Sequence, residues 1–358
     1  MISREGVIAV HVGAGYHAPS KEADYNQACK LACARGIEML QSRSSSLATL
    51  VAVMKILEDD PFTNSGTGSN LTFHGTVECD ASIMDGKTRL SASVGALQGV
   101  KNPIEAAHCL LKEQMKGKMP LGRVPPCFLV GNGAKQFAKD HGIEEALPGT
   151  MTTEKSLKSY KKYKRRLSEC ATKNEGFQKH QEGSSFLMDT VGAICLDTSG
   201  NISSAVSSGG ILLKHPGRIG HAAMFGCGCW SHNCEEDNFG VSCSATGSGE
   251  QIIRTNLASK CCQNVLNKDN PFQAIQETFT NDFVNSPLLC NDSEKLGGAI
   301  VLSYNQNNAE LVWAHTTDSM CLGYMSTRDK YPKVKMSRLS KESKMGESLC
   351  LGGCAFKL

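Results

Sequence analysis

The chain has 358 residues, 40% of them hydrophobic, and a formal net charge of +3. This length allows a large core in one big domain or two, while so mild a charge excludes nucleic-acid binding by the molecule as a whole. No run of eighteen apolar residues occurs, and the apolar segment at the amino terminus is too short for a secretory core, so we expect a soluble, intracellular protein without a membrane anchor.

The first 141 residues alternate between apolar runs and helical patterns. Residues 6–15, GVIAVHVGAG, are expected to form a buried strand that ends in a glycine turn, and a helix follows with Ser20 as its cap. Short strands of an antiparallel sheet are predicted between the turn signals of residues 62–97. Helices are predicted at 45–57, near 103–116 and near 131–141.

From about 150 to 187 the composition changes. Lys, Arg, Glu, Ser, Gln and Asn dominate, which predicts a linker or flexible loop. The next segment, TVGAICLDTSGNISSAVSSGG, has two apolar runs around a DTSGN turn and is typical of a β-hairpin. Beyond it we expect helices at 249–266 and 270–283 and strands at 299–304 and 309–315.

Strands at both ends of the chain with helices between them favour an α+β fold of stacked layers over an alternating parallel fold. The seventeen cysteines are scattered along the chain, and their spacing lacks paired clusters of zinc ligands. We therefore expect reduced thiols and no metal site.

The pair Asp189-Thr190 stands where the polar segment meets the hairpin. If the bond between them is cut, Thr190 becomes an amino terminus whose α-amine, with a pKa of roughly 7.7 to 8.0, can accept a proton near neutral pH. The threonine hydroxyl then has a base on its own residue, which is a known way to activate this weak nucleophile. Taken alone, an ordinary strand threonine is the better interpretation.

Three other features support a site at Thr190. Pairing the hairpin strands across DTSGN places residue 208 or 209 opposite Thr190, and position 208 is a serine. Arg218 follows a Pro-Gly turn, and its guanidinium suits a carboxylate, although a surface salt bridge is the ordinary alternative. The segment SATGSGEQ places glycines and hydroxyls before a helix, where backbone N–H groups can stabilise an oxyanion.

Six motifs follow one another along the chain: FTNSGTGSN, ECDASIMDG, DTVGAICLD, AVSSGG, HPGRIG and SATGSGE. In this order they resemble the N-terminal-nucleophile asparaginase family, from Gly6 to about Tyr324. The longer segments KHPGRIGHAAMFGCGCW, RVPPCFLVG and HTTDSMCLGYMS are similar to its taspase branch, threonine aspartases that cleave proteins after aspartate.

The resemblance implies a four-layer αββα sandwich that forms a single catalytic domain over residues 1–358. It also implies a proenzyme that cuts itself between Asp189 and Thr190, giving an α chain, 1–189, and a β chain, 190–358. No metal or cofactor is needed. The site residues that it implies are the nucleophile Thr190, its hydroxyl partner Ser208, the oxyanion-stabilising Asn64, Thr246 and Gly247, and the substrate anchors Arg218 and Lys21.

The residue three positions after Arg218 bears on the substrate. Asparaginases of the family have an aspartate there, which pairs with the free α-ammonium of a small substrate, whereas this chain has His221. An aspartate inside a protein has no free ammonium, so the loss of that carboxylate fits a protease. Protonation of His221 beside Arg218 would make activity fall at lower pH; alternatively, His221 is only a surface residue.

Residues 155–166 carry seven basic side chains and no acidic one. A solvated loop is the ordinary interpretation of such a run. The functional interpretation, which the resemblance supports, is a signal bound by a nuclear import receptor, with the protein in both nucleus and cytoplasm. Contacts to nucleic acid are a third possibility, but only Tyr160 and Tyr163 offer aromatic surfaces there.

Three functions remain open. The first is a self-processing threonine endopeptidase, a dimer of αβ heterodimers, for which the resemblance implies nuclear substrates such as histone methyltransferases of the mixed-lineage leukaemia type and the precursor of general transcription factor II A. The second is an asparaginase or isoaspartyl peptidase that acts on small molecules. The third is a non-enzymatic scaffold that binds partners through the basic segment. The tail from Ser326 onward has no predicted role.

Overall fold

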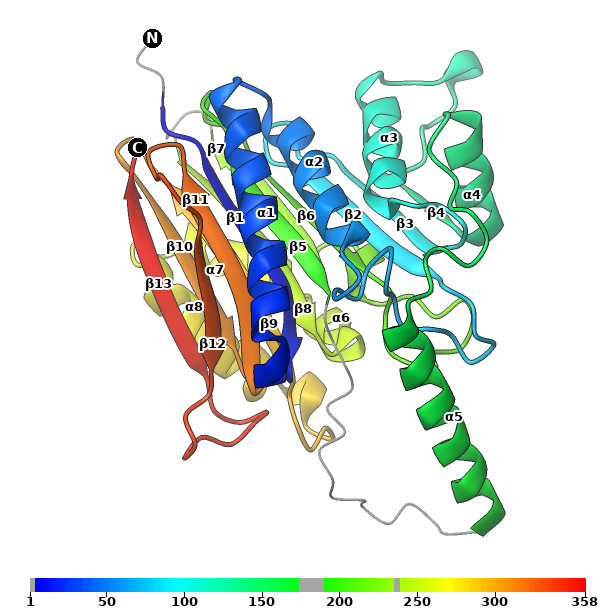
Figure 1. Ribbon diagram of the computed structural model, residues 1–358. Helices are drawn as coiled ribbons and strands as arrows, with labels where there is room; N and C mark the ends of the chain where they lie inside the picture. Colours follow the sequence, from blue (N-terminus) through cyan, green and yellow to red (C-terminus); the bar gives the residue numbers. More distant parts are fainter. Residues whose placement is uncertain (1–3, 174–189, 235–238) are drawn as a thin grey trace.

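Two antiparallel-rich sheets lie face to face in the computed structural model, which describes residues 4–173, 190–234 and 239–358 (Figure 1). The larger sheet has the strand order β12 (Lys333–Arg338), β11 (Ser319–Ser326), β1 (Val7–Gly15), β5 (Val191–Leu196), β6 (Ile202–Ser208), β2 (Cys79–Asp85), β3 (Ser91–Leu97), β4 (Phe128–Val130). The smaller sheet has the order β13 (Cys350–Lys357), β10 (Asn308–His315), β9 (Gly297–Tyr304), β8 (Phe239–Gly247), β7 (Cys229–Cys234).

Helices cover the outer face of each sheet, so the fold has four layers in the order αββα, as expected (Figure 1). The larger sheet is covered by α1 (Glu22–Gln41), α2 (Ser46–Asp59), α3 (Pro103–Met115) and α4 (Gly131–Asp140). The smaller sheet is covered by α6 (Gly249–Thr255), α7 (Leu257–Leu266) and α8 (Pro271–Glu277). None of the helices in the described residues is both long enough and apolar enough to cross a membrane.

The core fills the spaces between these layers, which explains why the central strands are apolar on both faces. Every residue of β5, for example, is buried. One side of β5 packs against α2, where Val191 and Cys195 belong to the helix-side core, and the other side contributes Ile194 to the core between the sheets. Strands buried on both faces read as continuous apolar runs, and this pattern made β1 and β5 predictable.

Several helix boundaries differ from the predictions. Ser45, predicted as the first residue of a helix, instead caps α2 by accepting a hydrogen bond from the backbone N–H of Ala48. Ser20 does not cap α1, because Pro19 begins a short 3-10 turn that includes Ser20 and delays the helix to Glu22. The predicted helix 249–266 is broken at Asn256, whose φ of 49° is left-handed. The helix that starts at Pro271 continues as a π-helix over Thr278–Val284.

The prediction of a flexible loop is wrong for the basic segment, which forms helix α5 (Glu154–Lys173). Thr153 and Ser156 exchange reciprocal backbone-to-side-chain hydrogen bonds of 3.2 and 3.1 Å that start the helix. Lys and Arg are good helix formers, so low hydrophobicity alone did not exclude a helix. Residues 174–187, the rest of the predicted loop, lie outside the described residues.

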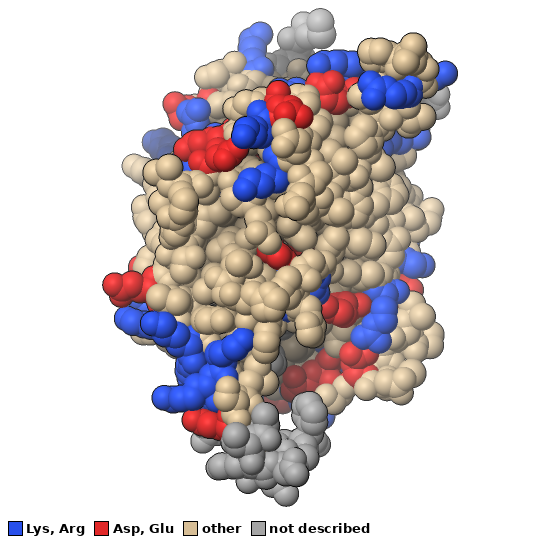
Figure 2. Space-filling view, turned by 90° about the vertical axis from the view of Figure 1, so that its right-hand side faces the viewer, with Lys and Arg blue, Asp and Glu red and all other residues tan. Residues whose placement is uncertain are grey.

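Aromatic and carbonyl contacts hold α5 against the body of the protein. The Lys155 ammonium donates to the carbonyl of Phe62, and that of Lys164 donates to the carbonyl of Phe73 and lies 3.2 Å from the centre of its ring. Figure 2 views the molecule from the side on which α5 lies in Figure 1, and Lys and Arg side chains gather toward its lower left. The middle of this face is nearly free of charged residues.

The tail after Ser326 completes both sheets. β12 pairs with β11 at one edge of the larger sheet, and β13 pairs with β10 at one edge of the smaller sheet. The seventeen cysteines all lie in described residues and are free.

Candidate active site

A small cavity lies where the ends of β5 and β6 in the larger sheet come close to the end of β8 in the smaller sheet. Its wall comes from the start of β5, the end of β6 and the loops that follow α2, β6 and β8. Its lining residues are Asn64, Thr190, Ser208, Gly210, Ile211, Arg218, Gly220, His221, Gly247 and Gly249. Of the predicted site residues, Thr246 and Lys21 are not in this lining, and Asp189 lies outside the described residues.

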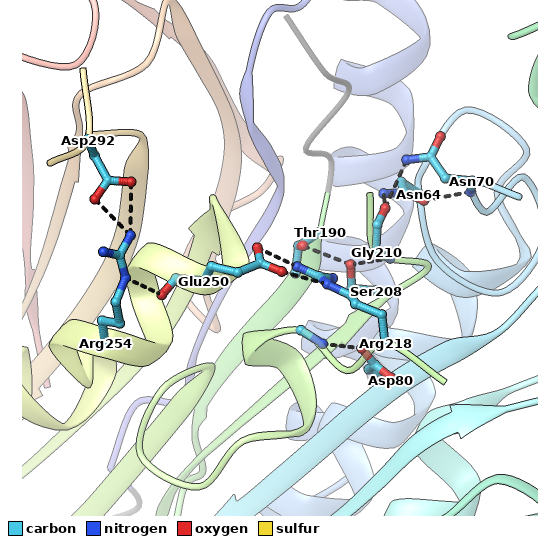
Figure 3. Close-up of polar contacts among 11 residues, drawn as sticks. Asn64, Asn70, Asp80, Thr190, Ser208, Gly210, Arg218, Glu250, Arg254 and Asp292 are labelled. Atoms are coloured by element: carbon cyan, nitrogen blue, oxygen red, sulfur yellow. Dashed lines mark hydrogen bonds and ion pairs between the residues drawn. The ribbon is translucent and has the colours of Figure 1, made fainter. Parts of the chain in front are cut away.

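Thr190 and Ser208 lie opposite each other at the open end of the hairpin that β5 and β6 form. Val191 pairs with Ser207, so the next pair outward is Thr190 with Ser208, as the turn geometry predicted. The Thr190 hydroxyl donates to the Ser208 hydroxyl over 3.0 Å, and both side chains are buried (Figure 3). Ser208 also accepts a hydrogen bond from the backbone N–H of Gly210. The predicted nucleophile therefore has a fixed hydroxyl neighbour.

Asn64 belongs to the loop after α2 and fastens it to the chain beyond β6. Its amide donates to the Gly210 carbonyl over 2.8 Å and accepts from the backbone N–H of Asn70 over 2.8 Å (Figure 3). The Asn70 amide donates to the same Gly210 carbonyl. Asn70 was not predicted, although it ends the FTNSGTGSN motif, because its role depends on a backbone contact that sequence spacing does not reveal.

The loop that carries Asn64 is wrapped around Glu58. The Thr67 N–H donates to the Glu58 carbonyl over 2.7 Å, and Gly66 has a φ of +55°. A Cβ atom at Gly66 would lie 2.4 Å from the Glu58 carbonyl oxygen, so only glycine fits there. Burial raises the pKa of the Glu58 carboxyl to about 8, which keeps it mostly neutral at pH 7.

Thr246 and Gly247 end β8 but serve different purposes. The Thr246 hydroxyl is fully buried and accepts a hydrogen bond from the backbone N–H of Ala14, so it joins β8 to β1. Gly247, with a φ of +130°, lines the cavity. A Cβ atom at Gly247 would lie 2.5 Å from the Leu296 carbonyl oxygen, which explains the glycine.

Two carboxylates at the start of β2 hold the loop that presents Arg218. Glu78 accepts the N–H of Gly217 and Asp80 accepts the N–H of Gly220, each over 2.8 Å. The other oxygen of Asp80 accepts the N–H of Ala96, and burial raises the pKa of this carboxyl. The ECDASIMDG motif thus positions Arg218, a role that the sequence did not indicate.

The Arg218 guanidinium projects into the cavity and is paired with Glu250. Its Nε and Nη2 atoms donate to the two carboxylate oxygens of Glu250 over 2.8 and 2.7 Å (Figure 3). The Arg218 side chain is 14% exposed, against 54% for Glu250. Glu250 is a second residue that sequence reasoning missed, although it closes the SATGSGE motif.

Lys21 lies on the surface beside the Asn64 loop. Its ammonium is 3.4 Å from the Asp24 carboxylate and 5.0 Å from the centre of the Phe62 ring, and its side chain is 54% exposed. In this conformation Lys21 does not line the cavity with Arg218, so its predicted anchoring role has no contact in support.

His221 is buried, which makes the interpretation as a surface residue wrong. Burial first, and the Arg218 charge second, lower its pKa to about 4, while its ring bonds the Ala245 carbonyl over 3.2 Å. His11, on the neighbouring β1, shares a hydrogen bond of 2.9 Å with the Ser244 hydroxyl and has its pKa lowered to about 3, mainly by burial. Both rings are neutral at pH 7. Among the described residues no group of His, Cys, Asp and Glu could hold a metal ion.

Comparisons with known proteins show the family to which this chain belongs. The family model described as asparaginase matches residues 4–335. The chain belongs to the asparaginase family. Similar proteins include the isoaspartyl peptidase/L-asparaginase of Mus musculus, 31% identical over 83% of this chain and 82% of its own length, and that of Homo sapiens, 34% identical over 70% and 74%. The isoaspartyl peptidase of Escherichia coli strain K12 is 31% identical over 70% and 74%.

Membership of this family makes the chain a hydrolase of the self-processing N-terminal-nucleophile type. The relatives' names mention isoaspartyl peptidase and asparaginase, so the comparisons favour the small-molecule alternative over the taspase branch.

The buried histidines predict a loss of stability in mild acid. His11, His221 and His315 have pKa values lowered to between about 3 and 4, whereas an unfolded histidine titrates near 6.5. The unfolded chain therefore binds more protons below pH 6.5, and the free energy of unfolding should fall as the pH drops from 6.5 toward 4. Urea titrations at several pH values measure this slope. His315→Asn should lower the number of protons taken up on unfolding by up to one and so reduce the slope. An unchanged slope would contradict the lowered pKa of His315.

Gly66→Ala should destabilise the protein by about 2 kcal/mol or more, because it combines a left-handed φ with a contact to the Glu58 carbonyl. Gly142→Ala is the matched control, since Gly142 has a φ of +68° but nothing within 4 Å of its Cβ position. The control should lose only about 1 kcal/mol. Equal losses in chemical denaturation would mean that the close contact carries no weight.

Proposed function

We propose that this protein is a self-processing threonine endopeptidase of the taspase branch, which cleaves proteins after aspartate. The observation that carries the proposal is the lining of the cavity. Arg218 is there to meet a carboxylate beside Thr190, while none of the described lining residues is acidic and the position of the asparaginase aspartate holds the buried, neutral His221. Such a cavity suits an aspartate within a chain, which has no α-ammonium to neutralise.

Self-cleavage divides the chain into an α chain, 1–189, and a β chain, 190–358, of one catalytic domain. The Thr190 hydroxyl attacks the Asp189 carbonyl carbon and its proton passes to a neighbouring base. The peptide nitrogen receives that proton from the base and leaves as the new α-amine of Thr190. Water then hydrolyses the ester, which gives the Asp189 carboxyl group and returns a proton to the Thr190 oxygen. Asp189 acts here as the first substrate aspartate.

In turnover the Thr190 amine takes the proton from its own hydroxyl as the oxygen attacks the carbonyl carbon of the substrate aspartate. The oxyanion faces backbone N–H at Gly247 and the Asn64 amide, which already has one hydrogen on Gly210 and one more to donate. Collapse expels the amine of the following residue, which receives the proton. Water, deprotonated by the Thr190 amine, then cleaves the ester and frees the aspartate carboxyl group.

The cellular part of the proposal is a protein of nucleus and cytoplasm, working as a dimer of αβ heterodimers on nuclear regulatory proteins. An import receptor would bind residues 155–166 on α5. Lys155 and Lys164 are engaged with carbonyls of the protein body. The receptor would therefore meet the outward side chains Lys158, Lys161, Lys162, Arg165 and Arg166 of the helix.

The second candidate is an isoaspartyl peptidase or asparaginase on the same machinery, and the names of the relatives support it. Its substrate would use Arg218 for a carboxylate in the same cavity, and its ammonium would have to pair outside the described lining. A non-enzymatic scaffold has less support, because Thr190, Ser208 and Arg218 line one cavity and Thr190 is hydrogen-bonded to Ser208.

Thr190→Ala should prevent self-cleavage and lower turnover by at least about a thousandfold, because the nucleophile and the new amine belong to one residue. Mass spectrometry of the wild type should find two pieces that meet between residues 189 and 190, and the variant should remain one chain. Thr190→Ser keeps both groups and should be processed slowly. A wild-type chain that hydrolyses aspartyl peptides while uncut would overturn the mechanism.

His221→Asp should shift activity toward small substrates that carry a free α-ammonium, by restoring a carboxylate for that charge. The measurement compares kcat/KM for an internal aspartyl peptide with that for free asparagine and an isoaspartyl dipeptide. We expect the ratio to favour the peptide in the wild type and to fall by about tenfold or more in the variant. His221→Asn controls for the loss of the ring. A wild type that prefers asparagine would support the second candidate.

A further inference from the structure

Glu250 binds the guanidinium of Arg218, the group proposed above to bind the substrate carboxylate. It occupies the Nε and Nη2 side of Arg218 through two short hydrogen bonds (Figure 3). A guanidinium has five donors, so the Nη1 and Nη2 end remains able to hold a second carboxylate. A bound substrate aspartate would then share Arg218 with Glu250, and the two negative charges would lie on adjacent edges of one cation.

Packing as well as Glu250 holds the guanidinium in place. Cβ atoms built at Gly220 and Gly249 would lie 2.7 Å from Nη1 and Nη2, and one at Gly210 would lie 3.1 Å from Nη1. The group therefore sits in a slot between three glycine backbones. Because packing also positions Arg218, removing the Glu250 carboxylate would leave the guanidinium a place in the cavity, and the charge of Glu250 becomes the effect to test.

The charge of Glu250 is directed at Arg218. The nearby Arg254 binds both carboxylate oxygens of Asp292, over 2.9 and 2.8 Å, and touches only the backbone carbonyl of Glu250 (Figure 3). Asp80, which also faces Arg218, has each carboxylate oxygen on a backbone N–H. Among the described residues, Glu250 is thus the exposed carboxylate that pairs with the Arg218 guanidinium.

We propose that Glu250 weakens the hold of Arg218 on carboxylates and so promotes release of the aspartate-ended product. The inference rests on the proposed function. Hydrolysis after an internal aspartate creates an α-carboxylate next to the β-carboxylate, so the product brings two negative charges where the substrate brought one. Repulsion by Glu250 acts more strongly on the product than on the substrate.

The test measures binding by calorimetry, so that it does not depend on turnover. The probes are one peptide that ends in aspartate with a free carboxylate and the same peptide with its α-carboxyl group amidated. Glu250→Gln keeps the shape and removes the charge, and Glu310→Gln makes the same charge change at an exposed position on β10. Processed wild type and both variants are compared at low salt, with kcat and KM for the internal aspartyl peptide as a second readout.

We expect Glu250→Gln to lower the Kd of the free-carboxylate peptide about tenfold and that of the amidated peptide by less, with stronger product inhibition and a salt-sensitive difference. Glu310→Gln should bind both peptides as the wild type does. Equal or weaker binding by Glu250→Gln would overturn this inference, since a residue that merely aligns Arg218 would weaken binding when changed.

If neither peptide binds the wild type or the variant, Arg218 does not bind carboxylates in this cavity, and the inference about Glu250 fails as well. Should the peptides bind while the wild type does not cleave after aspartate, the proposed function fails and the role of Glu250 is judged from the Kd values alone.

Discussion

The antiparallel seam between β5 and β6 is the constraint on which the site depends. Its register sets Thr190 against Ser208, and β6 continues into the loop that brings Gly210 and Arg218 to the cavity. A shift of one residue would turn every side chain of β5 to the opposite face. Because β5 is buried on both faces, such a shift would also misplace its apolar residues, so the register that packs the core is the one that assembles the site.

The sequence predicted what local geometry and burial determine. The turn length in DTSGN set the Thr190 and Ser208 pair, and continuous apolar runs located β1 and β5. It did not predict contacts made between distant segments. Glu250, Asp80 and Asn70 act through partners 32, 140 and 140 positions away in the chain, and nothing in their own neighbourhoods specifies those partners.

The basic segment illustrates a second limit. Its low hydrophobicity indicated a loop, yet the segment forms α5, and the ammonium groups of Lys155 and Lys164 bind the carbonyls of Phe62 and Phe73 elsewhere in the fold. The tail shows the same dependence, since β12 and β13 form by pairing with β11 and β10.

Family membership and the histidine at position 221 indicate different substrates. The names of the relatives fit small substrates, whereas His221 fits an aspartate inside a chain.

The strand order determines how the two pieces would behave after a cut before Thr190. In the larger sheet β1 comes from the first part of the chain but lies between β11 and β5 of the second part, and β2 borders β6 in the same way. Separating the two pieces would thus tear three rows of interstrand hydrogen bonds in the middle of a buried sheet. Strands of the two pieces alternate within one sheet. A cut backbone should therefore leave the pieces associated until the whole domain unfolds.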